Sequence, residues 1–497
     1  MKMFLAQNAK EKTFYLCVGV VLLFLLFWNL YTLQYTPIPW IDEVYFASVT
    51  HSLTVGNGLT LDIGLNEPVY HYGPVYFLLT SLFTLLGGMN IISFRLVGML
   101  FSFLSAFMVY KIMKKREVNK YINISVILLL LFDQLFVYCS HMGRMEFVAI
   151  FFILSAFYFY DRYKEDKGYL SLTSSTVCLL LSVLTTSRSL IVIVPIGLAW
   201  LVTLIKQKEW IKTFVFVGIP VIGFLVWLFV SYGSIPAFIE YFSKPSEGDK
   251  QVNFFQRFIG ASFDISKNHY PLVLLSLLTV AHSVKYKYFK DIQLYIYTIL
   301  LFYFVVHSTN DVYSILIMPF YFIIIGIGLQ KVWEKGISKN WWYRGMLALF
   351  ALCGVINLGI FGVKWMLLES SKEFRDEDLV EAWIKENIPE GSDVIGSYAF
   401  YYPCMENSCN FKSLKDIRKS EPQAKEYLAT QFRPQYILLS TEEAIPEALL
   451  TFGYIENKEL VAHYSPEPYI NWLDKLMTMI GLVNHSSYEG DLYRVIY

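Results

Sequence analysis

Charged side chains are scarce in this chain of 497 residues, because Asp, Glu, Lys and Arg together make up only 16% of it. Hydrophobic residues make up 55%, and the mean hydropathy is +0.45. Sparse charge among long apolar runs excludes an ordinary soluble enzyme and is typical of multi-spanning membrane proteins. The formal net charge is +0, so the sequence also lacks the basic balance that is typical of nucleic-acid binding.

Cysteine is rare as well, with six in the whole chain. Four of them lie in or beside apolar runs, and we interpret them as small hydrophobic residues: Cys17, Cys139, Cys178 and Cys353. Cys404 and Cys409 lie close together in the polar C-terminal region. On the outer side of a membrane this pair could close a small disulfide loop, and two free thiols are the alternative.

No small-residue cleavage site follows the first apolar run, so we interpret this run as a retained span and not as a signal peptide. Further apolar runs, most of them near the ~20 residues that a bilayer core requires, predict a mainly α-helical polytopic bundle of about 11 spans. The predicted spans are 13–33, 91–112, 121–138, 145–160, 169–186, 189–206, 212–232, 271–285, 291–307, 312–330 and 344–366.

Basic residues are distributed unequally between the two sets of connections. One set holds 21 Lys and Arg residues, in 1–12, 111–120, 161–168, 206–212, 285–290 and 331–344. The opposite set holds 6, in 34–90, 139–144, 187–188, 233–270 and 308–311. The positive-inside rule makes the first set cytoplasmic. We therefore expect an integral protein of the plasma (inner) membrane, with a cytoplasmic N-terminus and an outer C-terminus.

The apolar segment 74–89 is short and ends near a double glycine, and counting it as a span would move the basic segment 111–120 to the outside. We therefore predict that 34–90 is one long outer loop with two helices, at about 42–55 and 74–86. Outer loop 233–270 is either a mobile cover over a substrate or an ordinary connection.

The composition changes at about residue 367, where a charged, helix-capable stretch begins. Strand-like runs follow at 393–400, 435–440, 460–464 and 491–497, with a helix predicted near 441–452. We therefore predict two domains: a transmembrane catalytic domain over 1–366 and a small extracytoplasmic α/β domain over 367–497.

Ionisable residues gather at the outer ends of the spans, and the middles of the spans are nearly free of charge. A transporter would be expected to carry polar groups near the bilayer midplane. Single charges near span ends are usually structural, because they reach interfacial water. The adjacent acids Asp42 and Glu43, directly after the first span, are poorly explained in that way and indicate a functional site.

At these residues the chain resembles the GT-C type of polyprenyl-phosphate-sugar-dependent glycosyltransferases, which includes protein O-mannosyltransferases and lipid A aminoarabinose transferases. The resemblance rests on the acidic pair, the later segment 67–76 (Glu-Pro-Val-Tyr-His-Tyr-Gly-Pro-Val-Tyr), the non-spanning helix, the second-loop sequence 143–146 (Gly-Arg-Met-Glu) and the small outer domain. The family often has a lysine and two prolines in the first loop, where this chain has His71, Tyr72, Gly73 and Pro74.

The resemblance implies transfer of a sugar from a polyprenyl phosphate to an acceptor, with Asp42 as catalytic base and Glu146 as the second-loop acid. Glu43 is expected to orient Asp42 or to raise its pKa. Arg144 and Arg188 are candidates for binding the donor phosphate, because guanidinium groups bind phosphate oxygens in a fork. His71 and Tyr72 complete the predicted substrate-binding residues. A divalent metal on Asp42, Glu43 and His71 is optional, since no ligand spacing demands one.

The expected partners are the lipid-linked sugar donor, membrane lipids and a lipid, glycan or protein acceptor, without nucleic acid. Two other classes of function compete with this hypothesis. A transporter or flippase for a lipid-linked sugar would move its substrate without forming a bond. A non-catalytic scaffold would tolerate changes at Asp42, Arg144 and Arg188.

Overall fold

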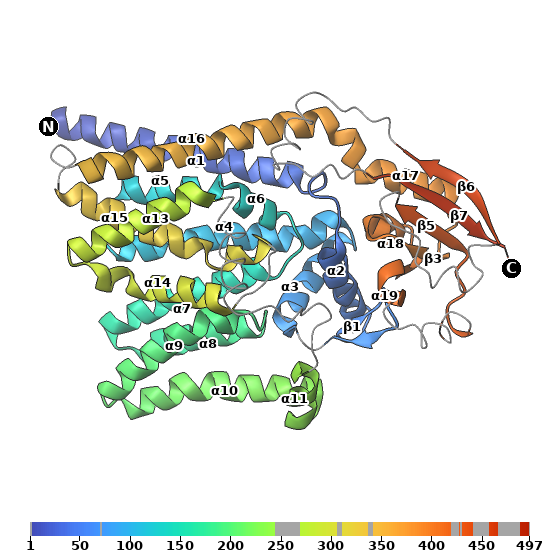
Figure 1. Ribbon diagram of the computed structural model, residues 1–497, viewed down its shortest axis with the longest axis horizontal. Coiled ribbons are helices and arrows are strands. Elements are labelled where there is room, and N and C mark those ends of the chain that lie inside the picture. The colour runs from blue at the N-terminus through green and yellow to red at the C-terminus, as the bar shows by residue number, and fades with distance from the viewer. Residues whose placement is uncertain are drawn as a thin grey trace.

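A computed structural model describes residues 2–69, 72–243, 269–305, 311–335, 341–418, 427, 430–440, 457–465 and 488–496. Long helices run side by side in a bundle, and a small sheet lies at one end of it (Figure 1). The predicted class, a mainly helical membrane bundle with a small α/β domain, is confirmed. Most of the predicted cover at 233–270 and all of the helix predicted near 441–452 lie outside the described residues.

Each of the predicted spans coincides with a helix or with two consecutive helices. The bundle consists of α1 (Lys2–Thr32), α4 (Ile91–Lys115), α5 (Lys120–Leu131), α6 (Gln134–Ser140), α7 (Glu146–Asp166), α8 (Tyr169–Val183), α9 (Ser189–Lys206), α10 (Trp210–Tyr232), α13 (Tyr270–Lys285), α14 (Phe289–Val305), α15 (Met318–Lys335) and α16 (Trp341–Ser371).

By length and composition alone, 5 described helices could cross a membrane, or up to 6 if the bent pair of α5 and α6 forms one span. The chain is therefore an integral membrane protein, and the count of about 11 spans stays a prediction.

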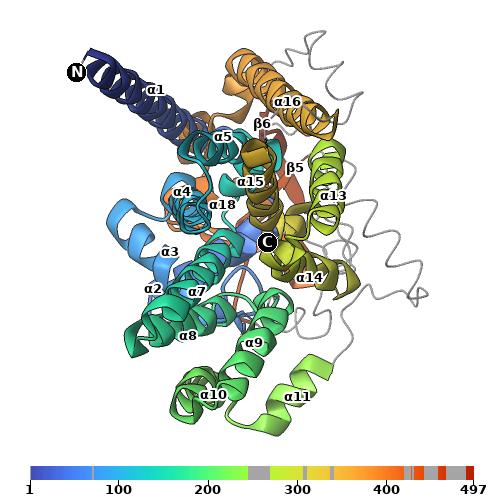
Figure 2. The same ribbon diagram turned by 90° about the vertical axis from the view of Figure 1, so that its left-hand side faces the viewer.

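Helix α4 packs against α3 (Pro74–Gly87), α5, α7 and α15, and Figure 2 shows it beside α3, α5 and α7. In its most apolar stretch 67% of the residues are buried, whereas the corresponding share is 11% in α1 and α10. Small residues on α4, among them Gly98, Ser102 and Ser105, let neighbouring backbones approach closely, which is how helices pack in lipid. The hydroxyl of Ser105 donates to the carbonyl of Phe147 on α7.

The segment 34–90, predicted to be the first outer loop, contains two helices, as predicted: α2 (Ile41–Thr54) and α3 (Pro74–Gly87). Between them β1 (Thr60–Leu61) and β2 (Glu67–Pro68) pair as a short antiparallel hairpin. The helices α2 and α3 pack on each other, and the hydroxyls of Thr50 and Thr80 lie 2.8 Å apart at their contact. Both helices lie between the bundle and the sheet (Figure 1).

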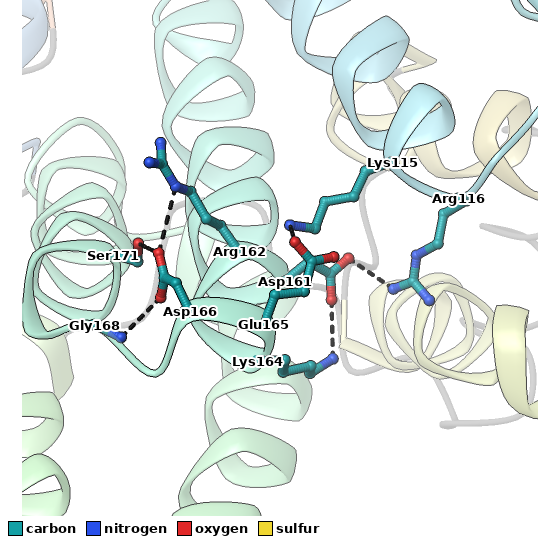
Figure 3. Close-up of polar contacts among 9 residues, drawn as sticks. All are labelled: Lys115, Arg116, Asp161, Arg162, Lys164, Glu165, Asp166, Gly168 and Ser171. Atoms are coloured by element: carbon teal, nitrogen blue, oxygen red, sulfur yellow. Dashed lines mark hydrogen bonds and ion pairs between the residues drawn. The ribbon is translucent and has the colours of Figure 1, made fainter.

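The opposite end of the bundle carries ion pairs from two of the connections predicted to be cytoplasmic (Figure 3). The carboxylate of Asp161 accepts from Arg116 at 2.7 Å and from Lys164 at 2.9 Å, and Lys115 pairs with Glu165 at 2.8 Å. The negative ends of α4 and α7 also stabilise the basic residues in the last turns of those helices. The two ends of the bundle are thus chemically different.

The C-terminal sheet has five strands in the order β4-β3-β5-β7-β6. Its strands are β3 (Asp393–Gly396), β4 (Asn410–Ser413), β5 (Tyr436–Ser440), β6 (Lys458–Tyr464) and β7 (Gly490–Val495). The pairs β3–β4 and β3–β5 are parallel, and β5–β7 and β6–β7 are antiparallel. Helix α17 (Glu377–Asn387) packs against β6 and α18 (Tyr401–Glu406).

Two details of the predicted strands were wrong. The strand predicted over 393–400 ends at Gly396, because the chain turns into a 3-10 helix over Tyr398–Phe400. Strand β4 was not predicted, since its four residues Asn-Phe-Lys-Ser have neither a long apolar run nor strict alternation. Helix α16 continues to Ser371, and the division into domains at 366 stays a prediction.

The C-terminal domain is joined to the first outer loop by direct contacts. The ammonium of Lys412 donates to the carbonyl of Asp62, and the amide of Ser413 donates to the carbonyl of Ile63 at 2.8 Å. On the other side of the domain, Gln34 donates to Asp376 at 2.9 Å. The sheet therefore holds the loop that carries Asp42 and Glu43.

Glu377, the first residue of α17, is buried in this contact region. Within the described part of the chain its Oε1 atom has no hydrogen-bond partner. Burial raises the pKa of this carboxyl well above its usual range, and the nearby Arg95 only partly offsets the effect. The folded protein therefore keeps a proton on Glu377 that an unfolded chain releases at a lower pH.

A carboxyl whose pKa is raised by folding stabilises the protein less as the pH rises from its unfolded pKa toward its folded pKa. We therefore expect Glu377→Gln, which resembles the protonated carboxyl, to raise the melting temperature at about pH 8 and to change it little at about pH 5. Thermal unfolding of the full-length protein in detergent measures this. The exposed Glu386→Gln on the same helix is the matched control, and an equal loss of stability at both pH values would contradict the expectation.

Candidate functional site

Asp42 and Glu43 occupy the first turn of α2. The positive end of the helix dipole stabilises negative charge there. Successive helical residues point about 100° apart, so two adjacent acids face different neighbours. The side chain of Asp42 is 35% exposed, whereas that of Glu43 is 0% exposed. The acidic pair is therefore divided between two environments.

Glu43 points into the interior and pairs with Arg95 on α4. The guanidinium of Arg95 donates from Nε to Oε1 at 2.6 Å and from Nη2 to Oε2 at 2.8 Å. Its remaining donors bond the carbonyls of Leu33 and Pro37, which connect α1 to α2. Removing one partner of a buried ion pair costs about 3–5 kcal/mol, because the other charge stays buried without compensation. The Arg95–Glu43 pair thus fixes the start of α2.

Asp42 lies on the exposed side and contacts Arg144, from the loop between α6 and α7. The Nη1 atom of Arg144 donates to Oδ2 of Asp42 at 2.6 Å. The other edge of the same guanidinium binds Glu146 in a fork, at 3.0 Å from Nε and 2.7 Å from Nη2. Within the described residues, Oδ1 of Asp42 accepts no hydrogen bond. This oxygen is available to a bound molecule.

Arg188, from the connection between α8 and α9, completes the group. Its Nη1 atom lies 3.9 Å from Oε1 of Glu146, which is a long ion pair, and its side chain is 33% exposed. Its guanidinium lies 4.0 Å from the ring centre of Tyr313, which also lies 5.2 Å from the guanidinium of Arg144. Arg188 is therefore the cation of this site that is best able to bind an added anion.

Tyr72 is close enough to Asp42 and Arg188 for their charges to act on its hydroxyl. Burial raises the pKa of Tyr72 to about 12, and Arg188 offsets part of that rise. The hydroxyl therefore stays protonated at neutral pH and can act as a hydrogen-bond donor. The ring of Tyr72 packs edge-on against Phe46 of α2 at 5.0 Å.

Two glycines allow these segments to approach one another. A Cβ atom on Gly73 would lie 1.9 Å from the carbonyl oxygen of Leu184, so a side chain there would push Tyr72 away from the Arg188 segment. A Cβ atom on Gly143 would lie 2.1 Å from the ring of Phe94 and 3.2 Å from Cγ of Glu43. Both glycines belong to the segments that carry the family resemblance, and their role is steric.

The structure brings Asp42, Tyr72, Arg144, Glu146 and Arg188 together, as the sequence predicted. Glu43 lies apart from them and reaches Asp42 only through the helix. His71 lies outside the described residues. Sequence reasoning missed Tyr313 and Trp40, whose rings flank Arg144. Trp40 lies two residues before Asp42, with Ile41 between them, whereas Tyr313 gave no signal because it sits at the start of a predicted span.

Metal binding fits these side chains poorly. The described residues contain no group of three or more His, Cys, Asp or Glu side chains that could hold a metal ion. Both oxygens of Glu43 are bonded to Arg95, and Oδ2 of Asp42 is bonded to Arg144. Two of the three predicted metal ligands therefore already face a guanidinium, and the third, His71, lies outside the described residues.

A family model described as "Dolichyl-phosphate-mannose-protein mannosyltransferase" matches residues 68–232, about a third of the chain. No curated protein matches by sequence. The fold is similar to crystal structures of ArnT from Cupriavidus metallidurans: the apo state has a TM-score of 0.64 at 12% identity over 97% of this chain and 98% of that one. The form bound to undecaprenyl phosphate has a TM-score of 0.62 at 11% identity, with the same coverage, 97% and 98%.

A second similar structure is the archaeal oligosaccharyltransferase AglB from Archaeoglobus fulgidus in complex with an inhibitory peptide and a dolichol-phosphate. Its TM-score is 0.51 at 11% identity, over 86% of this chain and 70% of that one. The resemblance predicted from the motifs is thus confirmed, and the family match agrees with the prediction of a membrane glycosyltransferase.

We expect Gly143→Ala to reduce both stability and activity, because the buried ring of Phe94 would have to move and would carry the Arg144 loop with it. Overpacking of this kind costs about 1–3 kcal/mol. Thermal unfolding and an activity assay on the same preparation measure the two effects. Gly197→Ala on α9 is the control, since a Cβ there meets nothing within 4 Å. A variant as stable and active as the wild type would show that the close approach is dispensable.

Proposed function

We propose that this protein transfers a sugar from a polyprenyl phosphate to an acceptor hydroxyl at the extracytoplasmic face of the membrane. One observation carries the proposal: a partly exposed carboxylate, Asp42, lies in one group with Arg144 and the partly exposed Arg188. A base for the acceptor and a cation for the leaving phosphate are the two groups that this reaction needs. The donor class is supported by the undecaprenyl phosphate and dolichol-phosphate in the similar structures.

Asp42 is the proposed base. In a single displacement the acceptor oxygen attacks the anomeric carbon, the bond from that carbon to the phosphate oxygen breaks, and the configuration inverts. The acceptor hydroxyl loses its proton to Asp42, as in the water activation by an inverting glycosidase. The Oδ1 atom suits this role, because no described residue bonds it and Oδ2 is held by Arg144 at 2.6 Å. Arg144 therefore acts as a positioning residue for the base.

Arg188 is the proposed phosphate ligand. Three nitrogen atoms of Arg144 already donate to Asp42 and Glu146, and its side chain is only 2% exposed. The ion pair of Arg188 with Glu146 is long, at 3.9 Å, so its guanidinium can bind a phosphate oxygen without losing a short ion pair in this group. The developing charge on the departing phosphate then strengthens that contact. The Tyr72 hydroxyl is a further donor for the same group or for the sugar.

The distribution of basic residues supports the extracytoplasmic placement. The group around Asp42 lies at the end of the bundle that carries the sheet (Figure 1). The basic segments around Lys115 and Arg162 lie at the other end, which the positive-inside rule assigns to the cytoplasm. A donor lipid would thus present its head group on the side of the C-terminal domain.

We expect Asp42→Asn to lower the transfer rate by about 10²–10⁴-fold, which is the usual contribution of a general base, and to leave folding intact. Membranes that contain the full-length protein are incubated with a panel of labelled polyprenyl-phosphate sugars, and the labelled product is identified. Asp378→Asn, an exposed acid of the C-terminal domain, is the control. Unimpaired transfer by Asp42→Asn would remove the assigned base, and label in no product with any donor would count against the reaction itself.

For Arg188→Gln we expect the KM for the donor to rise about 10–100-fold, because a charge-assisted contact to the phosphate is lost. Arg162→Gln, an arginine that is 57% exposed at the opposite end of the bundle, is the matched control. The KM is measured by varying the donor at a fixed acceptor concentration. A fall in kcat with an unchanged KM would place Arg188 in another role.

A further inference from the structure

Two thiols of the C-terminal domain meet in the turn between α18 and β4. The amide of Cys409 donates to the carbonyl of Cys404 at 2.9 Å, which brings the two residues close together, and both are free cysteines in this structure. Both residues are buried, with exposed fractions of 0% and 4%. A disulfide requires Cα atoms about 4.4–6.8 Å apart, and a direct backbone hydrogen bond between the two residues is compatible with that separation.

The two thiols differ in reactivity. The side-chain amide of Asn407 donates to Sγ of Cys409 at 3.6 Å and to the carbonyl of Ile388 at 2.9 Å, so it is held in place. The contact with the Cys404 thiol lowers the pKa of Cys409, although burial opposes this, and Asn407 adds to the lowering. Burial raises the pKa of Cys404. A donor held against Sγ of Cys409 favours the thiolate form of this residue, which is the form that attacks a disulfide.

The cysteine pair also lies between two segments of the C-terminal domain that contact the rest of the protein. On its α18 side, the ring of Tyr402 lies 6.2 Å from that of Phe94, the neighbour of Arg95. On its β4 side, Lys412 and Ser413 bond the loop at Asp62 and Ile63. A bond between Cys404 and Cys409 would therefore join the two segments through which the domain holds the start of α4 and the first outer loop.

We infer that Cys404 and Cys409 form an intramolecular disulfide in the mature protein. This inference rests on the extracytoplasmic placement proposed above, because thiols persist in the cytoplasm and are oxidised outside it. The co-reactant is an external disulfide of the thiol-oxidoreductase class. The Cys409 thiolate attacks it and forms a mixed disulfide, and the Cys404 sulfur then displaces the oxidant. One S–S bond replaces two S–H bonds, and two electrons and two protons pass to the oxidant.

The experiment uses the full-length protein in intact cells. Free thiols are blocked with N-ethylmaleimide before lysis, and the protein is unfolded, alkylated and cleaved after glutamate without reductant. Cleavage after Glu406 separates the two cysteines, so a disulfide appears as two linked peptides that carry no alkyl group and separate on reduction. We expect this result for Cys404 and Cys409, with alkylated peptides for the single buried cysteines Cys139 and Cys353. Alkylation of Cys404 and Cys409 without prior reduction would overturn the inference.

Stability gives an independent readout. We expect reductant to lower the melting temperature of the wild type by roughly 5 °C, because a disulfide restricts the unfolded chain. The double variant Cys404→Ser with Cys409→Ser should be insensitive to reductant, whereas Cys178→Ser should respond as the wild type does. A wild type that reductant does not affect would speak against the bond.

The topology is tested separately in the double serine variant. Glu390→Cys, at an exposed position of the C-terminal domain, should react with a membrane-impermeant maleimide in intact cells, and Arg162→Cys should be protected. Reduced thiols together with a labelled Glu390→Cys would overturn the disulfide alone. Reduced thiols together with a protected Glu390→Cys would overturn the disulfide and the proposed placement of the site.

Discussion

Two buried guanidinium groups hold the first turn of α2, and the geometry of the site depends on them. Arg95 fixes Glu43 on the inner side of the helix, and Arg144 fixes Asp42 on the outer side. In a low-dielectric interior, a carboxylate is tolerated only where a partner compensates its charge, which restricts the buried Glu43 to the position beside Arg95. The partly exposed Asp42 is held by its 2.6 Å contact with Arg144. Arg144 also pairs with Glu146, the first residue of α7, and so connects the start of α2 to the start of α7. The chemistry that we propose for Asp42 requires this rigidity, since a base must be held close to the acceptor oxygen.

The fold could be predicted largely from the sequence because lipid imposes strong constraints. Each predicted span coincides with a helix or with two consecutive helices, and the helix predicted at about 74–86 is α3. Its place in an outer loop stays a prediction from the double glycine and the count of basic residues. The small domain was harder to predict. Its strand β4 is four residues long and is stabilised by pairing with β3 and by the contacts of Lys412, and neither leaves a periodic pattern in the sequence.

The site could be predicted in part for the same reason. Charged residues at span ends are few, which drew attention to Asp42, Arg144, Glu146 and Arg188, and the family resemblance singled out Asp42 and Glu146 among them. The sequence did not show that Glu43 is buried against Arg95 while Asp42 is partly exposed beside Arg144, because this depends on which side of α2 faces Arg95. Tyr313 was missed because a tyrosine at the start of a span is ordinary in membrane proteins, where such rings settle at the interface. Only its 4.0 Å approach to Arg188 distinguishes it.

The contacts of Lys412 and Ser413 with the β1–β2 hairpin have a consequence for how this architecture diversifies. The sheet at the end of the chain and a hairpin near its beginning form one packed unit, although some 350 residues separate them in sequence. The ammonium of Lys412 also donates to the side-chain oxygen of Asn66 in the hairpin at 3.2 Å, and an exchange of the C-terminal domain that changed only one of these two residues would lose this contact. A functional chimera must therefore import residues 60–68 along with the sheet, and inherited variation in the two segments is expected to be correlated.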